Sequence, residues 1–375
     1  MLIGLPKEIK NHEYRVGLTP VSVRELVANG HQVVMQTGAG LGIGEDDDSY
    51  QRAGASIADT AEQVFADADM IVKVKEPQPN ECKMLRSGQV LFTYLHLAPD
   101  PTQTRLLQES DSVAIAYETV TDQHGGLPLL APMSEVAGRM SIQAGAACLE
   151  KSHGGSGKLL GGVPGVAPAN VLVIGGGVVG TNAIQMAAGM GAKVTVLDRS
   201  IARLRELDAQ FGGHISTVYS TQSALEQQVA NADLVIGAVL IPGAAAPKLV
   251  TRDMLKTMRK GSVLVDVAID QGGCFETSKA TTHQDPTYIV DDIVHYCVAN
   301  MPGAVANTSA HALNHATLPF TLALANLGYQ EALQRDANLL QGLNVHHGAI
   351  TNKPVADALE LSYVDPASVL APKAA

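Results

Sequence analysis

Three side chains with chemical potential follow short apolar runs in the first third of the chain: Arg15, Lys75 and His96. A guanidinium binds a carboxylate through two parallel hydrogen bonds, an ammonium stabilises negative charge on oxygen, and an imidazole moves protons near neutral pH. Taken singly, each has a plainer interpretation as a solvated charge or a structural histidine. If the runs are parallel strands, however, their carboxyl ends form the edge where ligands bind in such sheets. The three residues are therefore candidates for holding a substrate and moving its protons.

A glycine-rich motif in residues 171–198, VLVIGGGVVGTNAIQMAAGMGAKVTVLD, indicates a dinucleotide site. A strand-like run leads into Gly175, Gly177 and Gly180, which open a helix. The first glycine permits a tight turn, the second lets the backbone approach a pyrophosphate at the helix N-terminus, and the third lets helix and strand pack closely. A glycine turn that binds nothing is the plainer alternative. The context of strand, turn, helix, second strand and acid favours binding.

The acid of this motif, Asp198, selects the cofactor. It lies 18 residues after Gly180, near the spacing of about 20 at which an acid binds the adenosine ribose hydroxyls. A carboxylate there repels the 2′-phosphate of NADP. Arg199 is the residue type that holds such a phosphate, but the acid at the end of the strand usually decides the choice. We therefore expect NAD as the cofactor.

Two series of short strand-like runs alternate with helical stretches and must position these residues. This alternation predicts an α/β fold of two doubly wound, Rossmann-like domains with parallel sheets. The predicted strands are residues 2–5, 32–36, 70–74, 90–94 and 113–118 in the first series and 171–174, 193–197, 215–219, 233–239 and 263–267 in the second.

Two long helical runs, residues 133–151 and 305–327, are expected to link the domains, the first with Ser134 as a possible N-cap. The chain would enter the second domain by one helix and leave it by the other. We therefore predict a discontinuous substrate domain, residues 1–132 plus 305–375, and an NAD-binding domain, residues 133–304.

Composition and charge exclude several classes of protein. The 375 residues are 46% hydrophobic and 17% charged, with a formal net charge of −11, which gives no electrostatic reason to bind nucleic acid or an anionic membrane. No run approaches the roughly 18 apolar residues of a membrane span. The N-terminal residues lack the apolar segment of a secretory signal, and the four cysteines form no CxxC pair, so we expect a cytoplasmic protein.

A catalytic metal is not expected. His311 and His315 are four residues apart in a helical run, but position 312 is Ala, so the HExxH pattern of metalloproteases is absent.

Several runs resemble those of alanine dehydrogenases, and the similarity covers essentially the whole chain. They are GLPKEIKNHEYRVGLTP, VKVKEPQPNE, LFTYLHLA, GKLLGGVPGVAPANVLVIGGGVVG and DVAIDQGGCFETS. The resemblance implies an NAD-dependent, reversible oxidative deamination of L-alanine to pyruvate and ammonia. It also implies a homo-oligomer, a hexamer.

The same resemblance implies roles for individual residues. Arg15 would bind the substrate carboxylate, Lys75 would contact its carboxylate or carbonyl oxygen, and His96 would be the general acid/base. Asp270 would lie between the nicotinamide ribose and the reacting amine. Beside the three glycines, the implied cofactor contacts are Ser134, Val178, Val179, Asp198, Arg203, Ser220, Val239, Leu240, Val267, Asp270, Lys279, Asn300 and Met301.

Three alternatives remain beside this interpretation. One is the NAD-binding component of a nicotinamide nucleotide transhydrogenase, which needs no substrate side chains in the first domain. Another is a dehydrogenase that makes saccharopine or another opine-like amino acid. The third is a non-catalytic NAD-sensing module. The presence together of Arg15, Lys75, His96 and Asp270 favours an alanine dehydrogenase.

Overall fold

The computed structural model describes residues 1–239 and 246–370. The chain folds into two compact units, Met1–Met133 with Gly303–Ala375, and Ser134–Pro302. Leu240, one of the predicted cofactor contacts, lies outside the described residues.

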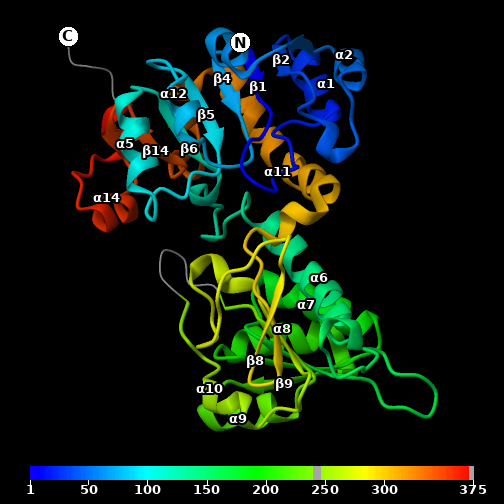
Figure 1. The fold of residues 1–375 in the computed structure, drawn as a ribbon. Helices are drawn as coiled ribbons and strands as arrows, with labels where there is room; N and C mark the ends of the chain where they lie inside the picture. Colours follow the sequence, from blue (N-terminus) through cyan, green and yellow to red (C-terminus); the bar gives the residue numbers. More distant parts are fainter. Residues whose placement is uncertain (240–245, 371–375) are drawn as a thin grey trace. The chain divides into compact units, whose positions relative to one another are not determined.

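The first unit is built on a mostly parallel sheet (Figure 1). Its strands are Leu2–Leu5 (β1), Gln32–Gln36 (β2), Ser56–Ala58 (β3), Met70–Val72 (β4), Val90–Thr93 (β5), Val113–Ala116 (β6), Leu343–His346 (β14) and Ala349–Ile350 (β15). They are ordered β15-β14-β6-β5-β4-β1-β2-β3. The pairings among β1 to β6 are parallel, whereas β14 is antiparallel to both β6 and β15.

Helices connect the strands of this unit. They are Pro20–Ala28 (α1), Asp47–Ala53 (α2), Ala61–Asp67 (α3), Pro79–Cys82 (α4), Pro101–Glu109 (α5), Ala306–Leu327 (α11), Tyr329–Arg335 (α12), Ala337–Leu340 (α13), Lys353–Leu359 (α14) and Pro366–Val369 (α15), with 3₁₀ turns at Leu41–Ile43 and Tyr117–Thr119. Several begin with a side-chain cap followed by proline: the Thr19 side chain accepts from Ser22 N before α1, and Asp100 accepts from Gln103 N before α5. Such caps satisfy amide groups that the first helical turn leaves unpaired.

The second unit has its own sheet. Its strands are Asn170–Ile174 (β7), Lys193–Asp198 (β8), Ile215–Tyr219 (β9), Leu234–Gly237 (β10), Val263–Asp266 (β11), Thr287–Val290 (β12) and Ile293–Tyr296 (β13), ordered β12-β13-β11-β10-β7-β8-β9. Its helices are Val178–Gly189 (α7), Ile201–Phe211 (α8), Gln222–Asn231 (α9), Arg252–Leu255 (α10) and most of Ala131–Cys148 (α6), with 3₁₀ turns at Lys151–His153, Gly212–His214, Val267–Gln271 and Met301–Val305. In the part of the chain that the structure describes, the pairing of β12 with β13 is antiparallel and the other pairings of this sheet are parallel.

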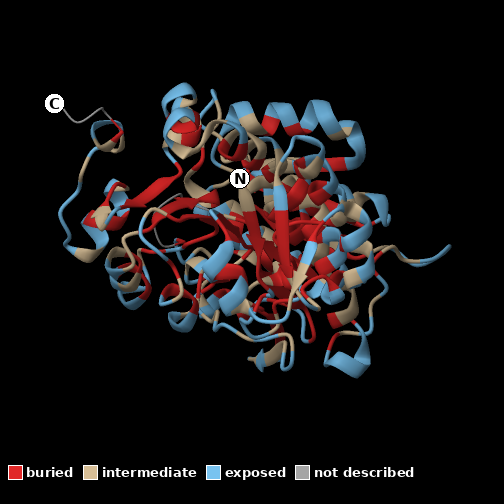
Figure 2. Ribbon diagram, turned by 90° about the horizontal axis from the view of Figure 1, so that it is seen from above, coloured by how far each residue is buried: buried red, intermediate tan, exposed pale blue. Residues whose placement is uncertain are grey.

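Alternating side chains of the central strand β7 enter two different cores. Val171 and Val173 pack in a cluster with residues of α7, whereas Leu172 and Ile174 pack in a second cluster with residues of α9. Because side chains alternate across a strand, the two clusters lie on opposite faces of the sheet. The strands are accordingly buried, and the outer sides of the helices are exposed (Figure 2). The second unit is thus doubly wound.

Several details differ from the sequence-based expectations. The sheets are not wholly parallel, because β12, β14 and β15 add antiparallel edges. The first linking helix begins at Ala131, so Ser134 lies inside α6 and is not its N-cap. The strand predicted to end at Glu118 ends at Ala116, because Tyr117–Thr119 turns into a 3₁₀ helix.

Among the described residues, no helix has both the length and the apolar character needed to cross a membrane.

Candidate active site

The carboxyl ends of neighbouring strands gather the predicted substrate residues at one edge of the first sheet. Arg15 follows β1, Lys75 follows β4 and His96 follows β5, and these strands are adjacent in the order β5-β4-β1. The strand order reverses between β1 and β4, because β2 and β3 lie beyond β1 on the other side. Ligands in open α/β sheets bind outside the carboxyl ends of strands at such a reversal. The three side chains therefore flank the expected ligand position of this unit.

Arg15 is held by an acidic partner on the same loop. Its Nε and Nη2 donate to the two carboxylate oxygens of Glu13 at 2.7 and 2.6 Å, and its Nη1 donates to Sδ of Met133 at 3.0 Å. The Arg15 side chain is only 2% exposed. Burial alone would lower the pKa of the guanidinium, but the hydrogen bond and charge of Glu13 raise it. The cation is therefore both charged and fixed in orientation.

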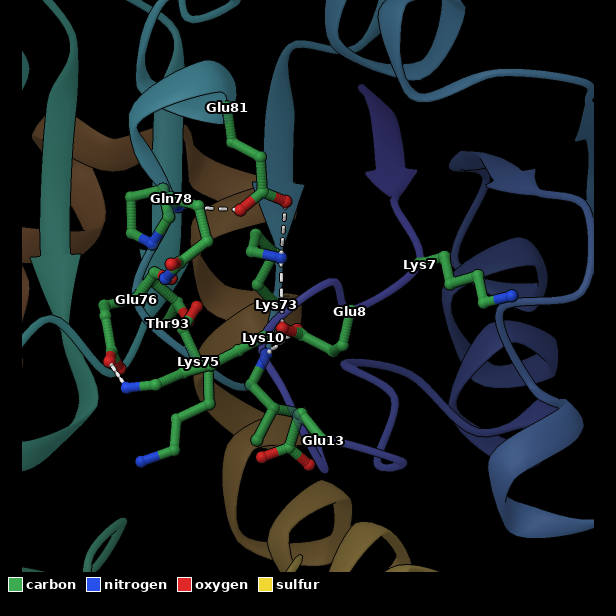
Figure 3. A network of polar contacts seen from close by, with 12 residues as sticks. Lys7, Glu8, Lys10, Glu13, Lys73, Lys75, Glu76, Gln78, Glu81 and Thr93 are labelled. Atoms are coloured by element: carbon green, nitrogen blue, oxygen red, sulfur yellow. Dashed lines mark hydrogen bonds and ion pairs between the residues drawn. The ribbon is translucent and has the colours of Figure 1, made fainter. Parts of the chain in front are cut away.

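The backbone around Lys75 is fixed on both sides. The Thr93 hydroxyl donates to the carbonyl oxygen of Lys75 at 3.0 Å, and the N–H of Val74 donates to Oε1 of Glu8 at 2.7 Å. Figure 3 shows the Lys75 side chain pointing away from Glu81, so its ammonium lies outside the buried group of charges behind it. These two hydrogen bonds therefore fix the backbone position from which the Lys75 side chain extends.

His96 has a left-handed backbone, with φ of 49°. Such a conformation is costly for a residue other than glycine, at about 1–3 kcal/mol, and commonly marks a functional position. The carboxylate of Glu118 accepts the N–H of His96 at 2.6 Å and that of Leu95 at 3.1 Å. The imidazole stacks on the ring of Tyr94 with 5.8 Å between centroids, and its Nδ1 lies 3.9 Å from Glu118. The surrounding groups thus hold the backbone from which the imidazole projects, and Tyr94 supports one face of the ring.

Two of these partners, Glu13 and Glu118, were not identified from the sequence as functional residues. Glu118 follows β6, the strand next to β5, so it stands at the same edge of the sheet as His96. Position after a strand was thus a usable signal for Glu118. Glu13 gave no such signal, because only the folded loop brings its carboxylate back onto Arg15 two residues later.

In the second unit, the predicted cofactor residues also follow the carboxyl ends of strands. The glycines follow β7, Asp198 ends β8, Ser220 follows β9, Val239 follows β10, Val267 and Asp270 follow β11, and Asn300 and Met301 follow β13. Val178 and Val179 are the first residues of α7. The remaining predicted contacts come from other elements: Ser134 from α6, Arg203 from α8 and Lys279 from the segment before β12.

The glycine turn has the shape that a pyrophosphate needs. Gly175 has φ of 99°, and a Cβ on Gly180 would come within 1.8 Å of the Gly175 carbonyl oxygen. Gly177 is the N-cap of α7. A Cβ on Gly177 would meet no atom within 4 Å. The turn therefore presents helix N-terminal amides and open space to a phosphate group, so these residues fit a dinucleotide.

Asp198 and Arg203 brace this turn. Asp198 Oδ2 accepts the N–H of Gly176 at 2.8 Å, and its Oδ1 accepts the N–H of Ser200 at 2.7 Å. Arg203 donates through Nε to the Gly176 carbonyl oxygen and through Nη2 to the Thr181 hydroxyl, both at 2.7 Å. Arg203 thus supports the glycine turn, a contact that the sequence did not indicate.

Asp270 is exposed on the 3₁₀ turn Val267–Gln271, and the turn is fixed from beneath by a buried acid. The carboxylate of Asp266 accepts N–H groups of Ala268 at 3.1 Å and Cys274 at 2.9 Å, and the Ser278 hydroxyl also donates to it. Burial raises the pKa of Asp266, although these hydrogen bonds oppose the shift. Asp270 therefore projects from a rigid turn.

Within residues 1–239 and 246–370, no three His, Cys, Asp or Glu side chains are grouped so that they could hold a metal ion. His311 and His315 lie on α11 with 6.5 Å between ring centroids.

Comparisons with known proteins identify the family of the chain. Residues 4–137 match the N-terminal domain, and residues 141–353 the C-terminal domain, of the family described as alanine dehydrogenase/PNT. An alanine dehydrogenase of Halomonas elongata is 61% identical over 99% of this chain and 100% of its own length. A solved L-alanine dehydrogenase superposes with a TM-score of 0.93 at 50% identity, covering 96% of this chain and 99% of that one. A transhydrogenase structure from Sinorhizobium meliloti has a TM-score of 0.83 at 26% identity, covering 94% and 100%.

Proposed function

Because the chain belongs to the alanine dehydrogenase/PNT family, we propose that it is an NAD-dependent L-alanine dehydrogenase, which interconverts L-alanine with pyruvate and ammonia. The observation that carries this proposal is the grouping of Arg15, Lys75 and His96 at the strand reversal of the first sheet. A chain that only bound or sensed a dinucleotide would need no such set of substrate groups.

The first unit supplies the groups that bind the amino or keto acid. The guanidinium of Arg15, oriented by Glu13, binds the substrate carboxylate. The ammonium of Lys75 contacts the substrate carboxylate or carbonyl oxygen and stabilises negative charge there in the direction of alanine synthesis. In the direction of alanine synthesis the substrates are pyruvate and ammonia. Both are small, and pyruvate is an anion, which suits two cations at one edge of the sheet.

The second unit supplies the cofactor site. The amides at the start of α7 bind the pyrophosphate, and the remaining acceptor capacity of Asp198 serves the adenosine ribose. The carboxylate also repels a 2′-phosphate, so the cofactor is NAD and not NADP. When bound, NAD accepts a hydride from Cα of alanine and NADH returns it to the imine of pyruvate.

Proton movements fall to His96 and Asp270. Loss of hydride leaves an iminium, water adds to its carbon, and the carbinolamine collapses to pyruvate and ammonia. The addition requires that a proton leaves the water, and the collapse requires that a proton reaches the nitrogen. An imidazole fixed at the same edge as the two cations is suited to both transfers. Asp270 contacts the nicotinamide ribose and the reacting amine.

The transhydrogenase interpretation is less well supported. The chain shares its fold with a transhydrogenase at 26% identity, against 50% with the solved L-alanine dehydrogenase. A hydride transfer between two nucleotides also involves no small acid for Arg15 to bind and no proton transfer for His96. It would therefore not explain the left-handed backbone of His96 or the Glu13–Arg15 pair.

We further propose a homohexamer that works in the cytoplasm. The family resemblance supports the hexamer, and sedimentation of the purified protein tests it. The four cysteines are free and buried, which suits a reducing compartment.

The experiment that tests the function follows NADH absorbance with pyruvate and ammonium, each omitted in turn, and with NADPH as the control. Oxidation that requires both substrates and NADH is the expected result. If NADH binds but is not consumed with pyruvate and ammonium, the protein is not an alanine dehydrogenase.

A further inference from the structure

We propose that Glu8 is a positioning residue of the reaction, which fixes the backbone that carries Lys75 and joins it to the loop that carries Arg15. The inference rests on the proposed function, because it assumes that Lys75 and Arg15 bind the substrate. It concerns a residue to which the sequence pattern gave no role.

Glu8 belongs to a buried group of charges behind the substrate residues (Figure 3). The ammonium of Lys73, whose side chain is 0% exposed, lies 3.1 Å from Oε2 of Glu8 and 2.8 Å from Oε1 of Glu81. Burial raises the pKa of Glu8, whereas the Lys73 charge and a backbone hydrogen bond lower it. Burial alone would lower the pKa of Lys73, but the two carboxylates raise it. One buried cation is thus shared by two acids.

The second oxygen of Glu8 reaches the backbone beside Lys75. Oε1 accepts the N–H of Val74 at 2.7 Å, while the Thr93 hydroxyl donates to the carbonyl oxygen of Lys75. The Lys73–Val74 peptide unit, one unit before the peptide of Lys75, and the carbonyl of Lys75 itself therefore each have a fixed partner. One carboxylate holds both this backbone and the buried Lys73, so movement of Glu8 would move the point from which the Lys75 side chain starts.

Glu8 also connects the two substrate cations through the chain. It stands on the loop between β1 and α1, which also carries Glu13 and Arg15, and β1 pairs with β4 beside it. Glu8 therefore bridges the loop after β1 to the segment after β4, across the position where the strand order reverses. The ion pair of Lys10 with Glu76 also joins this loop to this segment, but the Lys10 side chain is exposed, whereas Glu8 and Lys73 are buried.

Stability alone does not account for this arrangement. Buried ion groups are weak contributors to folding, because desolvation offsets the attraction, and apolar replacements are often neutral or stabilising. Positioning does account for it, because a shift of about 1 Å in a group that holds substrate can reduce turnover about 10²-fold.

The test compares Glu8→Gln and Glu8→Leu with the wild-type enzyme in reductive amination. Glu8→Leu removes both contacts but leaves Lys73 paired with Glu81, so a buried charge is not left alone. Glu8→Gln retains an acceptor for Val74 N–H or for Lys73, though not for both. Pyruvate and NADH kinetics are measured separately, together with the melting temperature of each variant.

Asp233 provides a matched control. Its carboxylate, in a residue 2% exposed, likewise accepts a lysine ammonium, that of Lys158 at 2.7 Å, and a backbone N–H, that of Asn170 at 2.8 Å. It stands before β10, at the amino ends of the strands of the second unit, which contains neither Arg15 nor Lys75. Asp233→Asn and Asp233→Leu should lower the melting temperature and leave the pyruvate kinetics unchanged.

We expect Glu8→Leu to lower kcat/KM for pyruvate by about 10²-fold, Glu8→Gln to lower it less, and neither to change KM for NADH. Wild-type pyruvate kinetics in a folded Glu8→Leu would overturn the inference, as would an equal rise in KM for NADH. If Glu8→Leu does not fold, the pyruvate kinetics and the KM for NADH of Glu8→Gln provide the same test. An inactive wild-type protein would instead overturn the proposed function.

Discussion

The strain at His96 is informative at the scale of the single residue. A left-handed backbone at a non-glycine position persists only where the surroundings impose it, and here Glu118 and Tyr94 do so. We predict that His96→Ala lowers kcat by about 10²–10⁴-fold, the usual contribution of a general acid or base. Stopped-flow or steady-state NADH oxidation measures the loss, and NADH binding should be retained. A near-normal kcat would remove His96 from the mechanism.

Glu118 should act through His96. Its carboxylate accepts the N–H groups of Leu95 and His96, and Glu118→Gln keeps an oxygen that accepts them. Glu118→Ala leaves both N–H groups without this acceptor, so the backbone that aims the imidazole is no longer held. We predict that Glu118→Ala lowers kcat by about 10²-fold, and that Glu118→Gln recovers much of the loss.

The control for this series is Glu109→Ala, which breaks only an exposed ion pair with Arg105 on α5. It should leave kcat unchanged. Equal activity of Glu118→Gln and Glu118→Ala would show that the hydrogen bonds to the backbone are not what orients His96.

At the scale of elements, two glycines of the turn between β7 and α7 have different roles: Gly180 allows close packing, and Gly177 leaves space for the cofactor. Gly180→Ala places Cβ within 1.8 Å of the Gly175 carbonyl oxygen, so it should lower the melting temperature and weaken NADH binding together. Gly177→Ala meets no atom within 4 Å and should keep the melting temperature. Its Cβ would crowd the pyrophosphate and weaken NADH binding roughly tenfold to hundredfold.

Gly189→Ala is the matched control, because it lies in the same helix and a Cβ there also meets no atom within 4 Å. It should leave NADH affinity unchanged, as isothermal titration can verify. Normal NADH affinity in Gly177→Ala would mean that the phosphate does not approach this turn.

Elements were predictable where the sequence pattern is local. Strands such as β1, β2 and β9 begin and end where their apolar runs do, and the glycine turn stands where its motif predicted. The strands β3, β12, β13, β14 and β15, which lie at or next to the edges of the two sheets, were missed. β12 is short and only partly buried, whereas β14 follows a helical region and pairs antiparallel with β6, far away in the sequence.

Some residues of the candidate site could likewise be predicted from the sequence, and others could not. Residues that follow strands, such as Lys75 and His96, were predictable because parallel strands bring their carboxyl ends to one edge. Glu8 and Arg203 were not predictable in their supporting roles, because their partners, the Val74 N–H and the Gly176 carbonyl, are backbone groups. Backbone groups carry no signal in the residue types.

At the scale of the whole molecule, each compact unit has a core of its own. Leu91 packs with residues of the first unit and Leu172 with residues of the second, at 0% and 1% exposure. We therefore predict two calorimetric unfolding transitions. NADH at about a hundredfold excess over its Kd should stabilise only the transition of Ser134–Pro302, by about 2.7 kcal/mol.

Matched core variants assign the two transitions. A buried Leu→Ala change removes about 2–5 kcal/mol, so Leu172→Ala should lower the transition that NADH raises, and Leu91→Ala should lower the other. Both side chains are almost completely buried, and each lies on a strand that is paired in parallel within its own sheet. The two variants therefore differ mainly in which unit they destabilise. A single transition that both variants lower, and that NADH raises as a whole, would mean that the two cores unfold as one cooperative structure and that cofactor binding stabilises the substrate groups as well.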